Sequence, residues 1–280
     1  RLQIWKQSSK NFKVADASIV MDNKVAVLTA NYLLAAGNLY IVTYKIYPSG
    51  VVKVDARFTS ADMQVAESEV SEATRTATFT PGNDAARKAA AKLNVPRIGV
   101  RFRLPAEMNV VEYFGRGPEE NYIDRNAGTL IGLYKTTADK MYYNYVRPQE
   151  NGHHTDTRWL SLSKKGGKGL TIVADSIIGF NALRNSIEDF DSEEALPHPR
   201  QWNNFSPEEI ANHDEEAARN VLRRMHHVND ITPRDFVEVC VDMKQQGVAG
   251  YNSWGARPEP GYTIPANQEY NWGFTLIPDK

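Results

Sequence analysis

A chain of 280 residues can bury a large core, as two domains or as one large all-β domain. Its 33 Lys and Arg residues nearly balance its 34 Asp and Glu residues, so no net field favours binding to nucleic acid or to an anionic membrane. No apolar run approaches the roughly 20 residues that span a bilayer, and a single cysteine, Cys240, cannot form a disulfide within the chain.

The N-terminal end has neither an initiator Met nor a signal-like apolar run, because the chain opens with Arg1 and Leu2. We therefore expect it to be a part of a longer protein. The compartment stays open between cytoplasm and periplasm.

Alternation of apolar and polar residues predicts β-strands along most of the chain. Residues 39–47 and 52–58 are joined by Pro48-Ser49-Gly50, a turn-forming link, so a β-hairpin is expected there. The same alternation predicts further strands at residues 98–104, 236–242 and 270–276. Strands with one apolar face stack to bury it, and the pattern therefore predicts an all-β fold, a large antiparallel sandwich.

Two helical segments interrupt this pattern. Ser206, Pro207 and Glu209 form a helix-start signature, and the helix is expected to run to about Met225. A weaker candidate covers residues 85–92. An acidic loop is expected at residues 191–205.

Four motifs carry a resemblance to a known family. They are VPRIG at 95–99, FGRGPEENYIDR at 114–125, PQENG at 148–152 and GVAGYNSWG at 247–255. In order and spacing they resemble the C-terminal small-chain domain (domain 5) of bacterial β-galactosidases of glycoside hydrolase family 2, over nearly the whole chain. The resemblance implies a single β-supersandwich domain over residues 1–280, similar to the galactose mutarotase fold. It also implies that the two catalytic glutamates lie upstream, in a TIM barrel that nothing in this chain matches.

The same resemblance implies a substrate-binding role for Trp254, whose indole would reach the active-site pocket as an apolar platform. Asn252 is a weaker candidate beside it. Gly247, Gly250 and Gly255 make a loop that can bend sharply and hold an indole out for a ligand. The chain departs from the family pattern at Ala249, the third position of the glycine motif, and at Tyr251 and Asn252. Folding of Trp254 back over a sheet edge is the alternative.

The charged motifs are interpreted as structural. A glycosidase needs two carboxyls roughly 5 to 9.5 Å apart, and several acids here could be nominated. Carboxylates beside guanidinium groups are usually ion-paired, which suits a general acid poorly. We therefore predict no catalytic residue in this chain and a loop-locking role for eight residues, namely Arg116, Glu119, Glu120, Asn121, Asp124, Arg125, Glu150 and Asn151.

Histidines support a second hypothesis, an autonomous carbohydrate-binding or aldose-1-epimerase-like module with a histidine acid and a carboxylate base. The candidates are His153, His154, His226 and His227. Adjacent residues on a strand point to opposite faces, so neither His-His pair forms a natural metal site, and no metal is expected.

The function expected from the resemblance is that of a β-galactosidase domain. The whole enzyme would hydrolyse terminal non-reducing β-D-galactose residues with retention, and this domain would complete the substrate pocket. Its expected partners are the upstream catalytic domains, the β-galactoside substrate and further copies in a homo-oligomer. No cofactor is expected in this chain, whereas Mg and Na sites are expected in other domains of the parent enzyme.

Overall fold

The computed structural model describes Trp5, Ser8 and residues 12–34, 37–60, 94–190, 228–252 and 254–279. Antiparallel strands dominate this part of the chain, and three short 3-10 helices lie between them. The strands are β1 (Lys13–Asp22), β2 (Val25–Leu33), β3 (Leu39–Ile46), β4 (Val52–Thr59), β5 (Arg97–Pro105), β6 (Val110–Gly117), β7 (Leu130–Thr137), β8 (His154–Ser163), β9 (Gly169–Leu183), β10 (Phe236–Gln245) and β11 (Tyr270–Pro278). The helices are η3 (Ile187–Phe190), η5 (Val228–Asp230) and η6 (Pro260–Tyr262).

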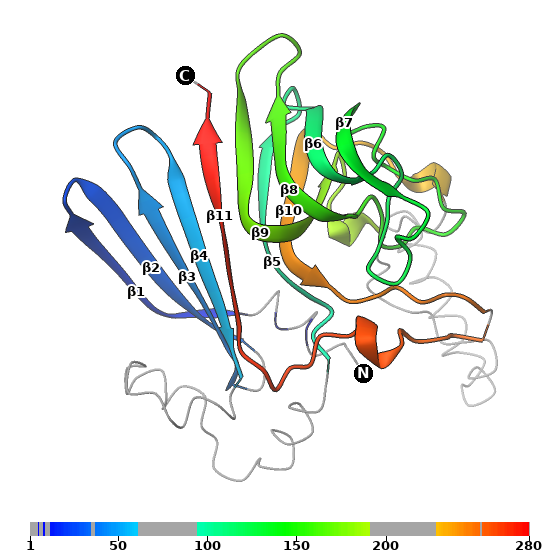
Figure 1. Cartoon of the computed structure of the whole chain (residues 1–280), viewed down its shortest axis with the longest axis horizontal. Helices are drawn as coiled ribbons and strands as arrows, with labels where there is room; N and C mark the ends of the chain where they lie inside the picture. The colour runs from blue at the N-terminus through cyan, green and yellow to red at the C-terminus, as the bar shows by residue number, and fades with distance from the viewer. Residues whose placement is uncertain are drawn as a thin grey trace, which may run out of the picture.

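The main path of strands follows the order β1-β2-β3-β4-β11-β9-β8-β6-β7. Figure 1 shows this path as one curved layer, with β5 and β10 behind it. The long strand β9 makes the connection, because residues 170–174 pair with β11 whereas residues 179–183 pair with β10. All-β architecture is therefore confirmed.

The predicted hairpin is confirmed in its register. β3 pairs with β4 from Leu39 opposite Thr59 to Ile46 opposite Val52. Gly50 closes the turn with a φ of 85°, a conformation that glycine adopts without steric cost. The alternating runs at 98–104, 236–242 and 270–276 also lie in strands, namely β5, β10 and β11.

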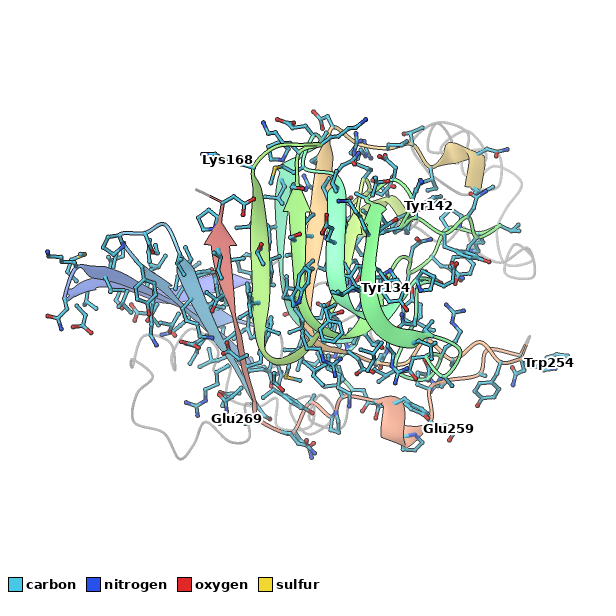
Figure 2. All side chains as sticks on the ribbon, turned by 45° about the horizontal axis from the view of Figure 1, so that its top comes forward. Tyr134, Tyr142, Lys168, Trp254, Glu259 and Glu269 are labelled. Atoms are coloured by element: carbon cyan, nitrogen blue, oxygen red, sulfur yellow. The ribbon has the colours of Figure 1, made fainter. Side chains whose placement is uncertain are left out.

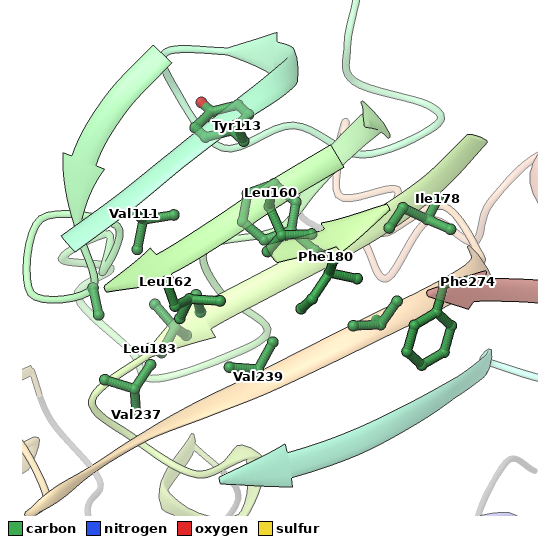
Figure 3. Close-up of a cluster of buried hydrophobic side chains, with 14 of the residues drawn as sticks. Val111, Tyr113, Leu160, Leu162, Ile178, Phe180, Leu183, Val237, Val239 and Phe274 are labelled. Carbon is green, nitrogen blue, oxygen red and sulfur yellow. The ribbon is translucent and has the colours of Figure 1, made fainter. Parts of the chain in front are cut away.

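The main core lies between the curved layer and β10. Figure 3 shows apolar side chains from several strands packing into it, among them Tyr113, Leu160, Phe180, Val239 and Phe274. All five are almost fully buried. Alternation with polar neighbours explains why β6 and β8 each turn one face inward, whereas β10 is buried on both faces.

A smaller core lies next to the start of β5. Phe58 packs there with Val95, Ile98 and Ile264, which come from segments far apart in the sequence. This cluster holds residues 94–96 against the loop that precedes β11, and Val95 donates its backbone N–H to the carbonyl of Ile264 at 2.7 Å.

Some predicted elements lie outside the described residues. These are the helix expected over 206–225, the weaker helix at 85–92, the acidic loop at 191–205 and the histidines His226 and His227. Within the described part of the chain, no helix is long and apolar enough to cross a membrane.

Candidate functional site

Trp254 lies at the tip of a loop that projects away from the sheets (Figure 2). Its side chain is 94% exposed, so it does not fold back over a sheet edge. Asn252 accepts a hydrogen bond from the backbone N–H of Trp254 at 2.8 Å through its Oδ1 atom. Asn252 therefore shapes the turn that carries the indole; contact of either residue with a substrate stays a prediction.

The loop begins with a left-handed backbone. Ala249 has a φ of 52° and Gly250 a φ of 81°, and Gly255 on the far side of Trp254 also has a φ of 81°. The two glycines adopt this region freely, whereas an alanine there is strained. Ala249, where the sequence departs from the glycine motif, therefore still adopts the conformation that glycine favours.

Asp124 connects this loop to the charged segment between β6 and β7. Its carboxylate accepts the backbone N–H of Val248 at 3.1 Å and that of Ala249 at 2.7 Å. Gly247 packs so closely that a Cβ atom there would lie 2.4 Å from Asp124 Oδ2. Two motifs more than a hundred residues apart thus meet at one carboxylate.

Glu120 is the centre of the charged segment. Its side chain is 5% exposed and accepts hydrogen bonds from Arg125 at 2.7 Å, from the backbone N–H of Gly152 at 2.7 Å, and from the hydroxyls of Tyr122 and Tyr145. Arg125 also lies over the Tyr122 ring, with its guanidinium carbon 5.0 Å from the ring centre. This arrangement ties residues 120–125 to the loop that leads into β8. Glu119, by contrast, is exposed.

The remaining motif residues also bond within the chain. The Asn121 side chain donates to the backbone carbonyls of Arg116 and Glu119. Its Oδ1 atom accepts hydrogen bonds from the backbone N–H and from the hydroxyl of Thr155. Asn151 bridges the backbone N–H and carbonyl of Tyr143.

Arg116 forms an ion pair with Asp156 and donates to the carbonyls of Asn126 and Thr129. Six of the eight predicted structural residues thus make side-chain contacts with the loops around them, whereas Glu119 contributes its backbone carbonyl; the loop-locking role of the eight residues stays a prediction.

A buried polar cluster surrounds Arg97. Its guanidinium lies 3.1 Å from the carboxylate of Asp242 and 3.4 Å from that of Glu150, and it donates to Gln245 at 2.7 Å and to Asn181. Sequence reasoning missed this cluster, although the sequence held one signal: acids at positions 238 and 242 interrupt an otherwise apolar run. The structure buries β10 on both faces. A central strand with buried acids requires cationic partners.

Electrostatics in this cluster follow from burial. Burial raises the pKa of Asp242 to about 7, although the nearby Arg97 guanidinium works against the rise. Burial works to lower the pKa of Arg97, but the carboxylates of Asp242 and Glu150 raise it above its ordinary value, so this arginine stays charged. Burial likewise raises the pKa of the Cys240 thiol far above its ordinary value, which makes the thiol unreactive.

The two neighbouring histidines occupy separate environments. His153 stacks on Tyr122 with ring centres 5.6 Å apart and lies 2.8 Å from Asn181 Oδ1, whereas His154 stacks on Phe180 at 5.3 Å and donates to the carbonyl of Arg116 at 3.1 Å. Burial lowers the pKa of His153 to about 3 and that of His154 to about 4. Both imidazoles are therefore neutral and screened from solvent.

A small cavity of about 10 Å³ lies beside this cluster, lined by Glu150, Asn181, Leu183, Phe190 and Cys240 among others. That volume accommodates about one water molecule, not a sugar ring. Among the described residues, no group of three or more His, Cys, Asp and Glu side chains is arranged to hold a metal ion.

An apolar row crosses the face of the sheet opposite the core. Successive register partners Leu133, Phe114, Trp159 and Val173 carry it over β7, β6, β8 and β9. Leu133 is 73% exposed and Val173 36%. The same face is charged on β4, where Lys53 pairs with acids on two strands. An apolar stripe left open beside a solvated region is typical of an interaction surface.

Comparisons with known proteins agree on one family. The family described as "Beta galactosidase small chain" matches residues 1–276. A β-galactosidase of Priestia megaterium is 28% identical over 280 residues, which is 99% of this chain and 21% of that protein. A β-galactosidase of Arthrobacter sp. is 40% identical over 124 residues, which is 42% of this chain and 12% of the relative.

A β-galactosidase of Streptococcus thermophilus is 24% identical over 277 residues, 98% of this chain and 21% of the relative. The chain thus spans about a fifth of the length of the Priestia and Streptococcus relatives, each of which matches nearly all of it. With a match that covers almost every residue, the chain belongs to the β-galactosidase small chain family.

Proposed function

We propose that this chain acts as the C-terminal domain of a longer β-galactosidase, which hydrolyses terminal β-D-galactose residues with catalytic glutamates supplied by upstream domains. The observation that carries the proposal is the loop of Trp254, an exposed indole on an anchored loop in a member of this family. An indole held in this way stacks on the C–H face of a sugar ring.

The charges of the chain support a role without its own hydrolytic centre. Glu120 and Glu150 each face an arginine and further hydrogen-bond donors. A general acid has to deliver its proton to the substrate, whereas these two carboxylates are engaged by donors within the chain. The isolated chain is therefore proposed to hydrolyse no β-galactoside.

The apolar row from Leu133 to Val173 supports docking of another part of the enzyme. Its four side chains form a continuous stripe over neighbouring strands, and the relatives have about four fifths of their length outside the region that this chain matches. We propose the upstream domains as the partner, within a homo-oligomer of the whole enzyme.

Fragment complementation tests this proposal. Purified chain is added to the separately expressed upstream portion of its parent protein, and hydrolysis of a chromogenic β-galactoside is assayed, with each part alone as control. We expect activity on mixing only. Turnover by this chain alone, or full activity of the upstream portion alone, would refute the domain role.

The epimerase-like alternative needs a histidine that can exchange a proton with a bound sugar. His153 and His154 are 1% and 2% exposed, and burial keeps their pKa values several units below neutral. For these two candidates the environments favour the domain role over the epimerase-like one, whereas His226 and His227 lie outside the described residues.

A further inference from the structure

We infer that Asp124 is a positioning residue for Trp254, because it fixes the root of the loop that presents the indole. This inference rests on the proposed function, in which the indole contacts the sugar. It adds a residue outside the loop, on a different motif, that determines where the indole is held.

Geometry at the root of the loop gives Asp124 this role. Its two oxygens are used separately, since Oδ1 accepts from Val248 N–H and Oδ2 from Ala249 N–H. Successive N–H groups that converge on one anion form a backbone nest, and the positive φ of Ala249 and Gly250 provides the curvature that such a nest requires. A carboxylate matches this arrangement because both of its oxygens accept hydrogen bonds.

The loop has few other attachments to the body. Gly247 donates its N–H to the carbonyl of Tyr262 at 2.8 Å, which closes the base of the loop. The bonds nearer the tip, from Trp254 to Asn252 and from Tyr251 to Glu259, stay within the loop. Among the hydrogen bonds of described residues 248–259, those to Asp124 connect the loop to the segment between β6 and β7.

Asp124 itself is held firmly. It lies in a tight turn in which Tyr122 and Arg125 exchange backbone hydrogen bonds, at 3.3 and 2.7 Å. Tyr122 is buried and stacks on His153, and Arg125 pairs with Glu120. Rigid support of this kind is what allows a residue remote from the reacting atoms to position another group.

A graded set of variants isolates the role of the carboxylate. Asp124→Asn keeps one acceptor oxygen and places an amide N–H₂ against the second backbone N–H, whereas Asp124→Ala keeps none. Gly247→Ala disturbs the same contact from the loop's side, because its Cβ would meet Asp124 Oδ2. Asp16→Asn, on exposed β1, is the matched control for loss of one negative charge.

The first measurement is amide hydrogen exchange in the purified chain. Asp124→Ala should abolish the protection of the Val248 and Ala249 amides, and Asp124→Asn should reduce it, with thermal unfolding close to that of the wild type. Asp16→Asn should leave both amides unchanged. Wild-type protection retained in Asp124→Ala would overturn the inference.

The second measurement is steady-state kinetics in the full-length protein that carries this chain. Asp124→Ala should raise KM about tenfold with kcat reduced less than threefold, since a displaced platform weakens substrate binding more than chemistry. Asp124→Asn and Gly247→Ala should lie between wild type and Asp124→Ala. Asp16→Asn should match the wild type.

Trp254→Ala in the same protein separates the two ways of failing. If Trp254→Ala leaves KM unchanged, the proposed function is wrong. If Trp254→Ala raises KM while Asp124→Ala does not, the proposed function stands and the positioning role of Asp124 is wrong.

Discussion

Glu120→Gln tests whether one buried carboxylate holds the charged segment together. Glu120 Oε1 accepts from Arg125 and Tyr145, and Oε2 accepts from Tyr122 and the backbone N–H of Gly152. Glutamine keeps the shape of the side chain but replaces one of these oxygens with an N–H₂ group. Whichever way the amide turns, two donors face another donor.

The magnitude follows from what those donors lose. A tyrosine hydroxyl can rotate and accept from the new N–H₂ group, but Gly152 N–H and the Arg125 guanidinium cannot. Loss of a buried hydrogen bond to a charged group costs roughly 1.5–3 kcal/mol, and a donor left unsatisfied adds to this, so Glu120→Gln should destabilise the chain by about 3 kcal/mol. An unfolding entropy of about 0.6 kcal/mol/K for a chain of this size converts this to a fall in Tm of about 5 °C.

Thermal unfolding followed by far-UV circular dichroism measures the effect, and Glu119→Gln is the matched control. Glu119 is the exposed neighbour, and the same change of charge there should move Tm by about 1 °C or less. If both variants shift Tm equally, the contacts of Glu120 do not stabilise the fold and the reasoning is refuted.

Three further predictions concern single side chains. Ala249→Gly should raise the free energy of unfolding by about 1 kcal/mol in urea titrations, because an L-residue at a φ of 52° is strained, whereas Ala256→Gly should not stabilise. Trp254→Ala should change the free energy of unfolding of the isolated chain by less than about 0.5 kcal/mol, because the indole is exposed. Trp272→Ala, which removes a ring stacked on Phe274, should lower it by about 3 kcal/mol, and equal losses in the two variants would contradict this. His154→Gln should make the free energy of unfolding fall less steeply as the pH is lowered. Burial lowers the pKa of His154 in the folded state to about 4 from 6.5, so its contribution to stability is present above pH 6.5 and is lost as pH falls, and the advantage of wild type over the variant should shrink by about 2 kcal/mol between about pH 8 and pH 5. An advantage that does not shrink would count against the assigned burial.

Strands β3, β4, β5, β10 and β11 could be predicted because alternation is a local property of the sequence. A side chain on each strand faces the core or the solvent according to its position in a two-residue period, which needs no knowledge of the partner strand. The exposure of Trp254 was expected from the family resemblance, because the glycines around it alone left open that the indole folds back over a sheet edge. Which strands pair was not predictable in this way, since β11 lies between β4 and β9, and neither adjoins it in the sequence.

The polar cluster around Arg97 escaped prediction for the same reason. Arg97 comes from β5, Asn181 from β9, Asp242 from β10 and Glu150 from the loop before β8, and the sequence does not show that the four meet. Asp124 and the two residues it contacts in the Trp254 loop, Val248 and Ala249, are separated by 124 and 125 positions in the sequence. Local patterns cannot reveal such pairings, because distant segments meet only when the sheets close.

The position of β11 has a consequence for how the protein is made. β1 to β4 share strand hydrogen bonds with the rest of the fold through β11 alone among the described strands, and β11 follows all the others in the chain. During synthesis the edges of β4 and β9 that receive β11 must wait, unpaired, until residues 270–278 have left the ribosome. A stalled or truncated chain would therefore expose two unpaired strand edges, which can pair with other chains. Such a chain would aggregate because β11 is made last, even though its sequence is normal.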